Sequence, residues 1–432
     1  MANLDDSKIS RRAVLGGAVG IPVAGILPAG AAPAAGILPV GAAPAAPTAL
    51  DRRAVEAVAS RLDRSLIALR RDLHRHPEPA GGERRTARVV ARRLRAAGID
   101  VITDVGGHGV VALVSGSRPG RTIAYRADMD AVPPSDQIQG GTQTAHLCGH
   151  DIHTAVGVGV AEVLARLRHR LAGSVLFLFQ PAEEALTGAA AMLGAGVFDR
   201  VRPAEIHALH CGPFPVGQFV VTPGFGLPGL DQGTVGLTGA HAAEQARQLA
   251  EEINALGTVS PPAGPADLER LVEEFQTPDG PLAEFVYMRA RAVGPEVQLS
   301  YRCWPENRYR DIRDDIRRLA APVVGATVSF PADPFPAMVC PEPEGYALQR
   351  YLRRTAGRDR VGRMHAAIPF NGEDFALFLQ QAPGTFTFLG VRSPDGSIES
   401  SYPHFGTFEP DERAIGHGVR AMAGWLAART RA

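Results

Sequence analysis

Apolar positions along the chain follow two alternating rhythms. Residues 51–73 carry an apolar side chain at every third or fourth position, as on one face of a helix, and residues 87–97 and 154–167 also favour helix. Between these stretches lie short apolar runs rich in Val and Phe, which are typical of buried strands. We predict such strands at residues 109–114, 122–127, 174–179 and 204–210. This alternation predicts the α/β class, with a mostly parallel sheet and flanking helices.

The pattern changes after Pro223. From there the expected elements follow in the order β-α-β-β-α-β, which is the ferredoxin-like signature. The strands are expected at residues 232–238, 285–292, 296–303 and 325–330, and the helices at residues 242–256 and 311–320. A polar, proline-rich insert at 258–281 interrupts them. We therefore predict a ferredoxin-like α+β domain at residues 223–330, inserted between two parts of a larger domain at 51–222 and 331–432.

Residues 1–50 have a different composition from the remainder. Arg11 and Arg12 precede an apolar stretch at 13–24, which Gly and Pro residues interrupt and which is too short for a membrane span. An Ala- and Pro-rich segment of eleven residues then occurs twice, at 25–35 and 36–46. This arrangement predicts a twin-arginine export signal and leader, and hence a secreted, cell-wall-associated or periplasmic protein without a membrane span after processing. The alternative is a disordered Ala/Pro leader with a chance Arg pair.

Composition excludes one class of partner. The 432 residues include 45 basic and 45 acidic side chains, so the basic excess of a nucleic-acid-binding protein is absent. The four cysteines have the spacing of neither a disulfide framework nor a zinc finger: Cys148, Cys211, Cys303 and Cys340. Cys148 lies inside a histidine-rich motif and needs an explanation of its own.

That motif is the strongest chemical signal in the chain. Residues 146–153 contain His146, Cys148, His150, Asp151 and His153, and thiolate and imidazole suit a zinc-like transition metal. The glycine between the Cys and the second His lets the backbone turn tightly. We expect the motif to form a loop just before a helix that begins at residue 154. The alternative is a polar helix cap with an incidental buried cysteine.

Acidic side chains follow two of the expected strands. Glu183 and Glu184 come after the strand at 174–179, where α/β enzymes place their sites, so one could bind metal and the other could act as general base. Asp128 and Asp130 come after the strand at 122–127 and could orient a ligand histidine or a base. The alternatives are the first turn of a helix for the Glu pair and an ordinary turn for the Asp pair.

These motifs together resemble the aminoacylase, hippurate hydrolase and auxin-conjugate hydrolase branch of the dinuclear metallopeptidases. The opening motif of this family is similar to residues 71–78, and its Arg-Ala-Asp-Met-Asp motif matches 126–130. The further matches are the His-x-Cys-Gly-His-Asp-x-His motif at 146–153, the paired-Glu motif at 180–184, a late Gly-x-Glu-Asp-Phe motif at 372–376 and two single histidines, His210 and His404. Seven matches in the same order are a specific signal, although His210 and His404 would not be chosen alone.

The resemblance implies a site and a reaction. Two divalent ions, Mn²⁺ or Zn²⁺, would be held by a bridging Cys148 with His150, Glu184, His210 and His404. Glu183 would be the general base that activates water, and Asp130 and Asp151 would orient the site. The substrate would be an N-acyl amino acid, a small peptide or a related conjugate, cleaved at its amide bond.

The predicted inserted domain departs from the family pattern. In the family it serves as a lid and dimerisation domain and carries a Gly-Gly-His-type motif, whose His stabilises the oxyanion, often from the neighbouring subunit. Here residues 238–243 keep His241, but Gly294 and Pro295 stand near the place of an Asn-x-x-Pro motif. We expect His241 to be catalytic in a homodimer, and the grip on the substrate carboxylate, the dimer contact, or both to differ. The alternative for His241 is an ordinary His at a strand-to-helix junction.

Two other functions compete with hydrolysis. The altered inserted domain would also suit a catalytically impaired binding or regulatory protein on the same fold, which would bind ligand without turnover. A thiol-nucleophile or redox enzyme using Cys148 would stay active after chelation, but it has no need of the adjacent Glu pair. Chelation therefore separates the metal-dependent amidohydrolase from the thiol enzyme.

Overall fold

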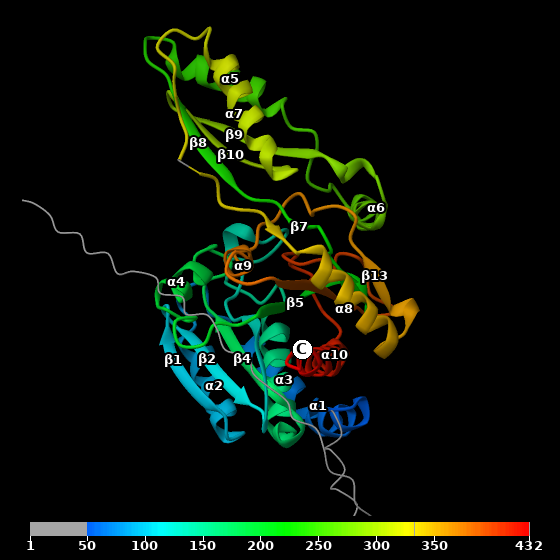
Figure 1. The fold of residues 1–432 in the computed structure, drawn as a ribbon. Helices are drawn as coiled ribbons and strands as arrows, with labels where there is room; N and C mark the ends of the chain where they lie inside the picture. Colours follow the sequence, from blue (N-terminus) through cyan, green and yellow to red (C-terminus); the bar gives the residue numbers. More distant parts are fainter. Residues whose placement is uncertain (1–49, 332, 432) are drawn as a thin grey trace, which may run out of the picture. The chain divides into compact units, whose positions relative to one another are not determined.

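The computed structural model describes residues 50–331 and 333–431, so the predicted export signal lies outside the described residues. Its largest element is a sheet in the order β1-β2-β4-β3-β5-β14-β6-β13 (Figure 1). Strand β3 is parallel to β4 and β5, β14 is parallel to β5, and β13 is parallel to β6. The strand bounds are β1 (Asp100–Val105), β2 (Gly109–Ser115), β3 (Arg118–Asp128), β4 (Ala172–Gln180), β5 (Glu205–Pro215), β6 (Phe219–Val221), β13 (Val361–Arg363) and β14 (Gly384–Arg392). The predicted α/β class and mostly parallel sheet are confirmed.

Helices cover both faces of this sheet. One core cluster packs the sheet against five helices: α1 (Arg52–His74), α2 (Arg84–Ala96), α3 (His150–Arg166), α8 (Glu342–Thr355) and α10 (Arg413–Arg429). A second cluster packs the other face against α4 (Gly188–Gly194), α6 (Pro265–Gln276) and α9 (Phe375–Leu379). Helix α3 is buried along nearly its whole length, which explains why its sequence is apolar almost throughout rather than amphipathic.

Helix α3 begins earlier than the sequence pattern indicates. We expected a loop up to residue 153, but the helix starts at His150. Gly149 precedes it with φ 91, and a Cβ at this position would lie 2.6 Å from Sγ of Cys211. Glycine therefore permits both the left-handed turn and the close contact, and His150 and His153 lie in the first turn of the helix.

A smaller sheet follows in the middle of the chain, in the order β11-β8-β10-β9. Its strands are β8 (Asp231–Gly236), β9 (Phe285–Val293), β10 (Glu296–Trp304) and β11 (Thr327–Ser329). Helices α5 (Ala242–Asn254) and α7 (Tyr309–Ala320) pack on it around Val235, Val297 and Leu299 (Figure 1). The short strands β7 (Gly226–Leu227) and β12 (Met338–Val339) pair with each other, and in the sequence they lie just before and just after the strands of this sheet. The domain boundaries that we predict from the sequence stay a prediction.

The segment that interrupts this region contains a helix. We expected a polar, proline-rich insert at 258–281, and the structure places α6 within it. The buried side chains Leu268, Leu271, Val272 and Phe275 join the core of the larger sheet, in the cluster that also contains Val220 and Met364. The chain therefore leaves the smaller sheet after α5, packs against the larger one, and returns at β9.

None of the helices in the described part of the chain is long and apolar enough to cross a membrane.

Candidate active site

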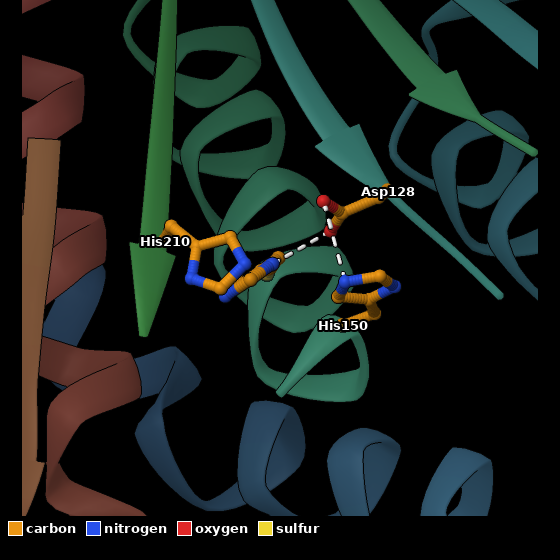
Figure 2. Close-up of side chains that lie close together, drawn as sticks. Asp128, His150 and His210 are labelled. Atoms are coloured by element: carbon orange, nitrogen blue, oxygen red, sulfur yellow. Dashed lines mark hydrogen bonds and ion pairs between the residues drawn. The ribbon is translucent and has the colours of Figure 1, made fainter. Parts of the chain in front are cut away.

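The site forms where neighbouring parallel strands end. Strand β3 ends at Asp128, β4 ends at Gln180 just before the Glu pair, and β5 carries His210. The carboxyl ends of parallel strands lie at one edge of a sheet, so these residues meet there. The first turn of α3 brings His150 to the same edge, and Figure 2 shows Asp128, His150 and His210 facing one another.

Five of the residues predicted as metal ligands are joined by short distances. The ligand atoms of Cys148, His150 and Glu184 all lie within 4.8 Å of one another. Sγ of Cys148 is 3.5 Å from Nε2 of His210, and Oε2 of Glu184 is 3.5 Å from Nε2 of His404. Residues from four distant segments thus form one continuous donor set.

The three histidines of this set are oriented alike. Nδ1 of His150 lies 3.0 Å from the carbonyl oxygen of Asp130, that of His210 lies 2.7 Å from the carbonyl oxygen of Cys211, and that of His404 lies 3.0 Å from the carbonyl oxygen of Asp136. A carbonyl oxygen can only accept, so each Nδ1 carries the proton and donates it. In the neutral form of each ring, Nε2 is then left with a lone pair that faces the centre, as in ligand histidines of metal sites.

The donor set fits a cation. Nε2 of His150 and Oε1 of Glu184 are buried, 3.7 Å apart, and have no hydrogen-bond partner among the described residues. Buried polar atoms without partners are rare, and a divalent ion would satisfy both. Burial raises the pKa of the Cys148 thiol well above its usual value, as do the neighbouring acids Glu184 and Glu183. A bound cation would supply the positive charge that favours the thiolate form of Cys148. A cysteine that acts as a nucleophile without a metal needs electropositive neighbours instead, whereas the neighbours of Cys148 are acids.

Glu183 lies at the edge of this set among other acids. Its side chain is 6% exposed, and its Oε2 is 3.9 Å from Nε2 of His150. Burial and the charges of Glu373, Glu184 and Asp374 raise the pKa of Glu183 well above its usual value. A carboxylate in such surroundings is a stronger base than one in water.

Arg126 balances this acidic group. Its guanidinium is 1% exposed and binds Asp128 at 2.5 Å and Glu373 at 2.7 Å, with Asp374 at 3.3 Å. Its Nε also donates to Oε1 of Gln180 at 2.8 Å. The buried guanidinium of Arg126 therefore connects the ends of β3 and β4 to the late Glu-Asp motif before α9.

The two predicted orienting acids have different positions. Asp130 contacts the donor set directly: its Oδ1 is 3.2 Å from Nδ1 of His150, and its Oδ2 accepts from the backbone N–H of Glu184 at 2.9 Å. Asp151 faces away from the set and binds Nε of Arg70 at 2.8 Å and Nδ1 of His74 at 2.9 Å. Asp151 therefore fixes α1 against the start of α3.

His153 has a role that the sequence did not reveal. Its Nδ1 lies 2.6 Å from Oδ1 of Asp128, and its Nε2 accepts the backbone N–H of Cys211 at 2.7 Å. Both ring nitrogens are thus occupied, and the side chain connects β3 to the backbone next to His210. His146, from the same motif, is 1% exposed and neither ring nitrogen has a hydrogen-bond partner in the described residues.

His241 does not join the cluster within this chain. It precedes α5 beside the smaller sheet, its side chain is 81% exposed, and its nearest acid is Glu244 at 4.0 Å.

Arg302 reaches the site from the smaller sheet, although the sequence did not single it out. Among the described residues its guanidinium donates to two carbonyl oxygens, of Pro228 at 3.4 Å and of Gly229 at 3.3 Å. Nη1 would lie 2.6 Å from a Cβ at Gly372, directly before Glu373. Burial lowers the pKa of Arg302 to about 10, while the charge of Glu183 acts in the opposite direction. A guanidinium with no carboxylate partner in the described residues therefore faces the site.

The fold and this donor set define a metal-dependent amidohydrolase. Residues 124–428 match the family described as Peptidase family M20/M25/M40, and the chain belongs to it. This confirms the resemblance seen in the motifs.

Over most of its length the chain is similar to proteins that are named as hydrolases. N-acetylcysteine deacetylase of Bacillus subtilis is 31% identical over 369 residues, which cover 81% of this chain and 93% of the relative. Thermostable carboxypeptidase 1 of Saccharolobus solfataricus is 30% identical over 389 residues, covering 83% and 93%. Among solved structures, a dinuclear metal binding peptidase of the M20 family from Bacillus subtilis superposes with a TM-score of 0.63 at 27% identity, covering 86% of this chain and 98% of that one.

Proposed function

We propose that this enzyme hydrolyses the amide bond of an N-acyl amino acid, a small peptide or a related conjugate, with Glu183 as general base. The observation that carries this proposal is the set of inward-facing donors with the acid-surrounded Glu183 at its edge. The names of the relatives, a deacetylase and a carboxypeptidase, support the same bond type.

We propose that two divalent ions complete the site. Cys148, His150, Glu184, His210 and His404 would hold them. When bound, such ions polarise the amide carbonyl and lower the pKa of water. Manganese and zinc both suit this mixture of thiolate, imidazole and carboxylate ligands. The metal content of protein purified with each ion will show which of the two ions the site retains.

The side chains around the site have separate roles in the proposed reaction. Glu183 takes a proton from the attacking water and returns it to the nitrogen of the leaving amine, since the neighbouring acids disfavour its charged form and so make it a strong base. Asp130 holds His150 and the backbone of Glu184 in register through one carboxylate. Arg126 keeps Glu373 and Asp374 fixed beneath the base.

Arg302 suits the carboxylate of the substrate amine. The guanidinium has five donors and finds only two weakly placed carbonyl oxygens in the described chain, so an arriving carboxylate would gain charge-assisted hydrogen bonds. This chain has Gly294 and Pro295 near the place of the family's Asn-x-x-Pro motif. Binding by Arg302 would explain how the chain holds a substrate carboxylate without that motif.

The test uses the chain loaded with Mn²⁺ or Zn²⁺ against hippurate, N-acetyl amino acids and dipeptides. We expect release of free amine that a chelator abolishes, and at least a thousandfold lower kcat in Glu183→Gln with unchanged metal content, because only the base is lost. Glu184→Gln is the matched variant, and it should lose metal as well as activity.

The outcomes separate the competing functions. Ligand binding without turnover by metal-loaded protein would favour the binding or regulatory alternative. Turnover that survives complete removal of metal would contradict the metal mechanism and favour a thiol enzyme.

We also propose a homodimer in which His241 of one subunit serves the site of the other, because its exposed side chain does not join the donor set of its own chain. Mixing the inactive Glu183→Gln and His241→Ala proteins should then restore part of the activity, since the mixed dimer holds one intact site. Monomers by light scattering, or no recovery on mixing, would contradict this assignment.

We further propose that the enzyme is exported through Arg11 and Arg12. Replacing both by Lys should leave the enzyme in the cytoplasm, as measured by fractionation; unchanged export would contradict the twin-arginine route.

A further inference from the structure

The loop that carries the Glu pair contains a strained residue. Ala182, directly before Glu183, has φ 52, in the left-handed region that residues with a Cβ seldom adopt. Its carbonyl oxygen accepts from the N–H of Thr187 at 3.2 Å and of Gly188 at 3.1 Å, which closes the loop. Ala182 lies between the end of β4 and the Glu pair, so its backbone conformation helps to set the direction of Glu183 and Glu184.

Two buried carboxylates grip the loop on either side of Glu183. Oε1 of Glu83 accepts the backbone N–H of Ala182 at 2.8 Å, and Oδ2 of Asp130 accepts that of Glu184 at 2.9 Å. Asp130 also orients His150 and so belongs to the site already described. Glu83 touches none of the donor set and comes from the start of α2, 99 positions away in the sequence.

Glu83 is an unusual buried acid. It is 0% exposed and forms no ion pair in the described residues, and its Oε2 has no hydrogen-bond partner there. The same Oε1 also accepts the backbone N–H of Gly81 at 2.9 Å. A buried carboxyl without a cation is costly, so stability alone gives little reason for an acid here.

We propose that Glu83 is a positioning residue for the general base and the metal ligand next to it. By accepting the N–H of Ala182, it holds this residue in the left-handed conformation and thereby aims Glu183 and Glu184 at the donor set. This inference rests on the proposed function, in which Glu183 is the base and Glu184 binds metal.

The first test compares Glu83→Met with Glu83→Gln. Both side chains match Glu in length, but only the amide of Gln keeps an oxygen that can accept the N–H of Ala182. We expect E83Q to stay within about threefold of the wild type, since the acceptor remains. We expect E83M to bind Mn²⁺ or Zn²⁺ about tenfold more weakly and to lose at least about tenfold in kcat with little change in KM, because a misaimed ligand and base leave substrate binding intact.

The second test changes Ala182 itself. Glycine adopts the left-handed conformation without the steric cost that a Cβ imposes, so Ala182→Gly should recover about fivefold of the metal affinity lost in E83M while changing the wild type little. Ala182→Val should weaken metal binding even with Glu83 intact, because a β-branched residue at positive φ is more strained. The valine variant keeps the proposal testable should E83M not fold.

Some results would overturn the proposal. A folded E83M with wild-type metal affinity and kcat but a lower melting temperature would make Glu83 a purely structural residue. Loss in E83M that Ala182→Gly leaves unchanged would place its action elsewhere, for instance at Gly81. Metal affinity is measured without substrate, so a chain that cleaves nothing in the panel would count against the proposed hydrolysis while the titrations still decide the role of Glu83.

Discussion

Single side chains at the site are fixed by partners that leave one defined atom facing the centre. The Nδ1–H groups of His150, His210 and His404 each donate to a backbone carbonyl, which leaves Nε2 as the inward donor. The family resemblance implied which residues meet, but not which ring nitrogen each would present. The ring orientation comes from carbonyl groups of Asp130, Cys211 and Asp136, whose positions depend on the folded backbone.

Arg302 gives a prediction at this scale. We expect Arg302→Met to lower kcat/KM about tenfold to a hundredfold for substrates with a free carboxylate, because a charge-assisted hydrogen bond contributes about 1.5–3 kcal/mol. The carboxamide of the same substrate should lose much less. Steady-state kinetics on the two substrates measure the difference, with the exposed Arg310→Met on the same sheet's helix α7 as control. Equal losses on both substrates would contradict a role in binding the carboxylate.

Among the elements, α6 shows how composition can conceal a helix. Its buried positions Leu268, Leu271, Val272 and Phe275 follow the i, i+3, i+4, i+7 spacing, and Pro265 stands in its first turn. The surrounding Pro and polar residues made the segment resemble a loop. The periodicity was present in the sequence, whereas the surface that α6 covers is formed by residues from other elements.

The packing of α6 can be tested by shortening one side chain. Phe275→Ala should lower the free energy of unfolding by about 3–5 kcal/mol, because it removes a buried ring and leaves a cavity. The exposed Glu273→Ala on the same helix should change it by less than about 0.5 kcal/mol. Urea unfolding of the whole chain measures both, and a cost below about 1 kcal/mol for Phe275→Ala would show that α6 contributes little to the core.

For the molecule as a whole, a buried acid ties the last helix to the sheet. Glu205, at the start of β5, is 2% exposed and binds Arg429 of α10 and Arg121 of β3, with Nε2 of His207 at 3.3 Å. Burial alone would raise the pKa of Glu205, but His207 and Arg429 lower it to about 2. The chain's last helix is thereby anchored beneath strands that come from its middle.

This anchor predicts a pH dependence of stability. Since the folded pKa of about 2 lies below the ordinary value of 4.5, the ionised Glu205 stabilises the fold above about pH 4.5 and loses this contribution as the pH falls toward 2. Allowing for the partly exposed arginines, we expect Glu205→Gln to cost about 2 kcal/mol at pH 7 and progressively less below pH 4.5. Denaturation of both proteins at pH 7 and at pH 3 measures the difference, and a constant difference would contradict the anchor.

Local sequence was enough to predict the α/β class, the order of the main elements, the family and which residues could bind metal. Periodicity and short motifs are local properties, and the strand ends at Asp128 and near Glu183 already indicated one edge of a sheet. The start of α3 was placed too late because the left-handed Gly149 and its contact with Cys211 involve a strand that follows much later in the sequence.

Tertiary contacts alone revealed the role of His153 and the positions of Glu83 and Arg302 next to the site. Glu83 binds the backbone of a residue 99 positions away, and no local pattern marks it. His153 stands in the predicted metal motif, but its bond to a residue 58 positions away could not be read from that motif. Arg302 lies in a strand of the smaller sheet, and its approach to Gly372, directly before Glu373, is what relates it to the site. A side chain's chemistry is local, but its pKa, its protonated nitrogen and its free donors depend on which distant groups the fold brings to it.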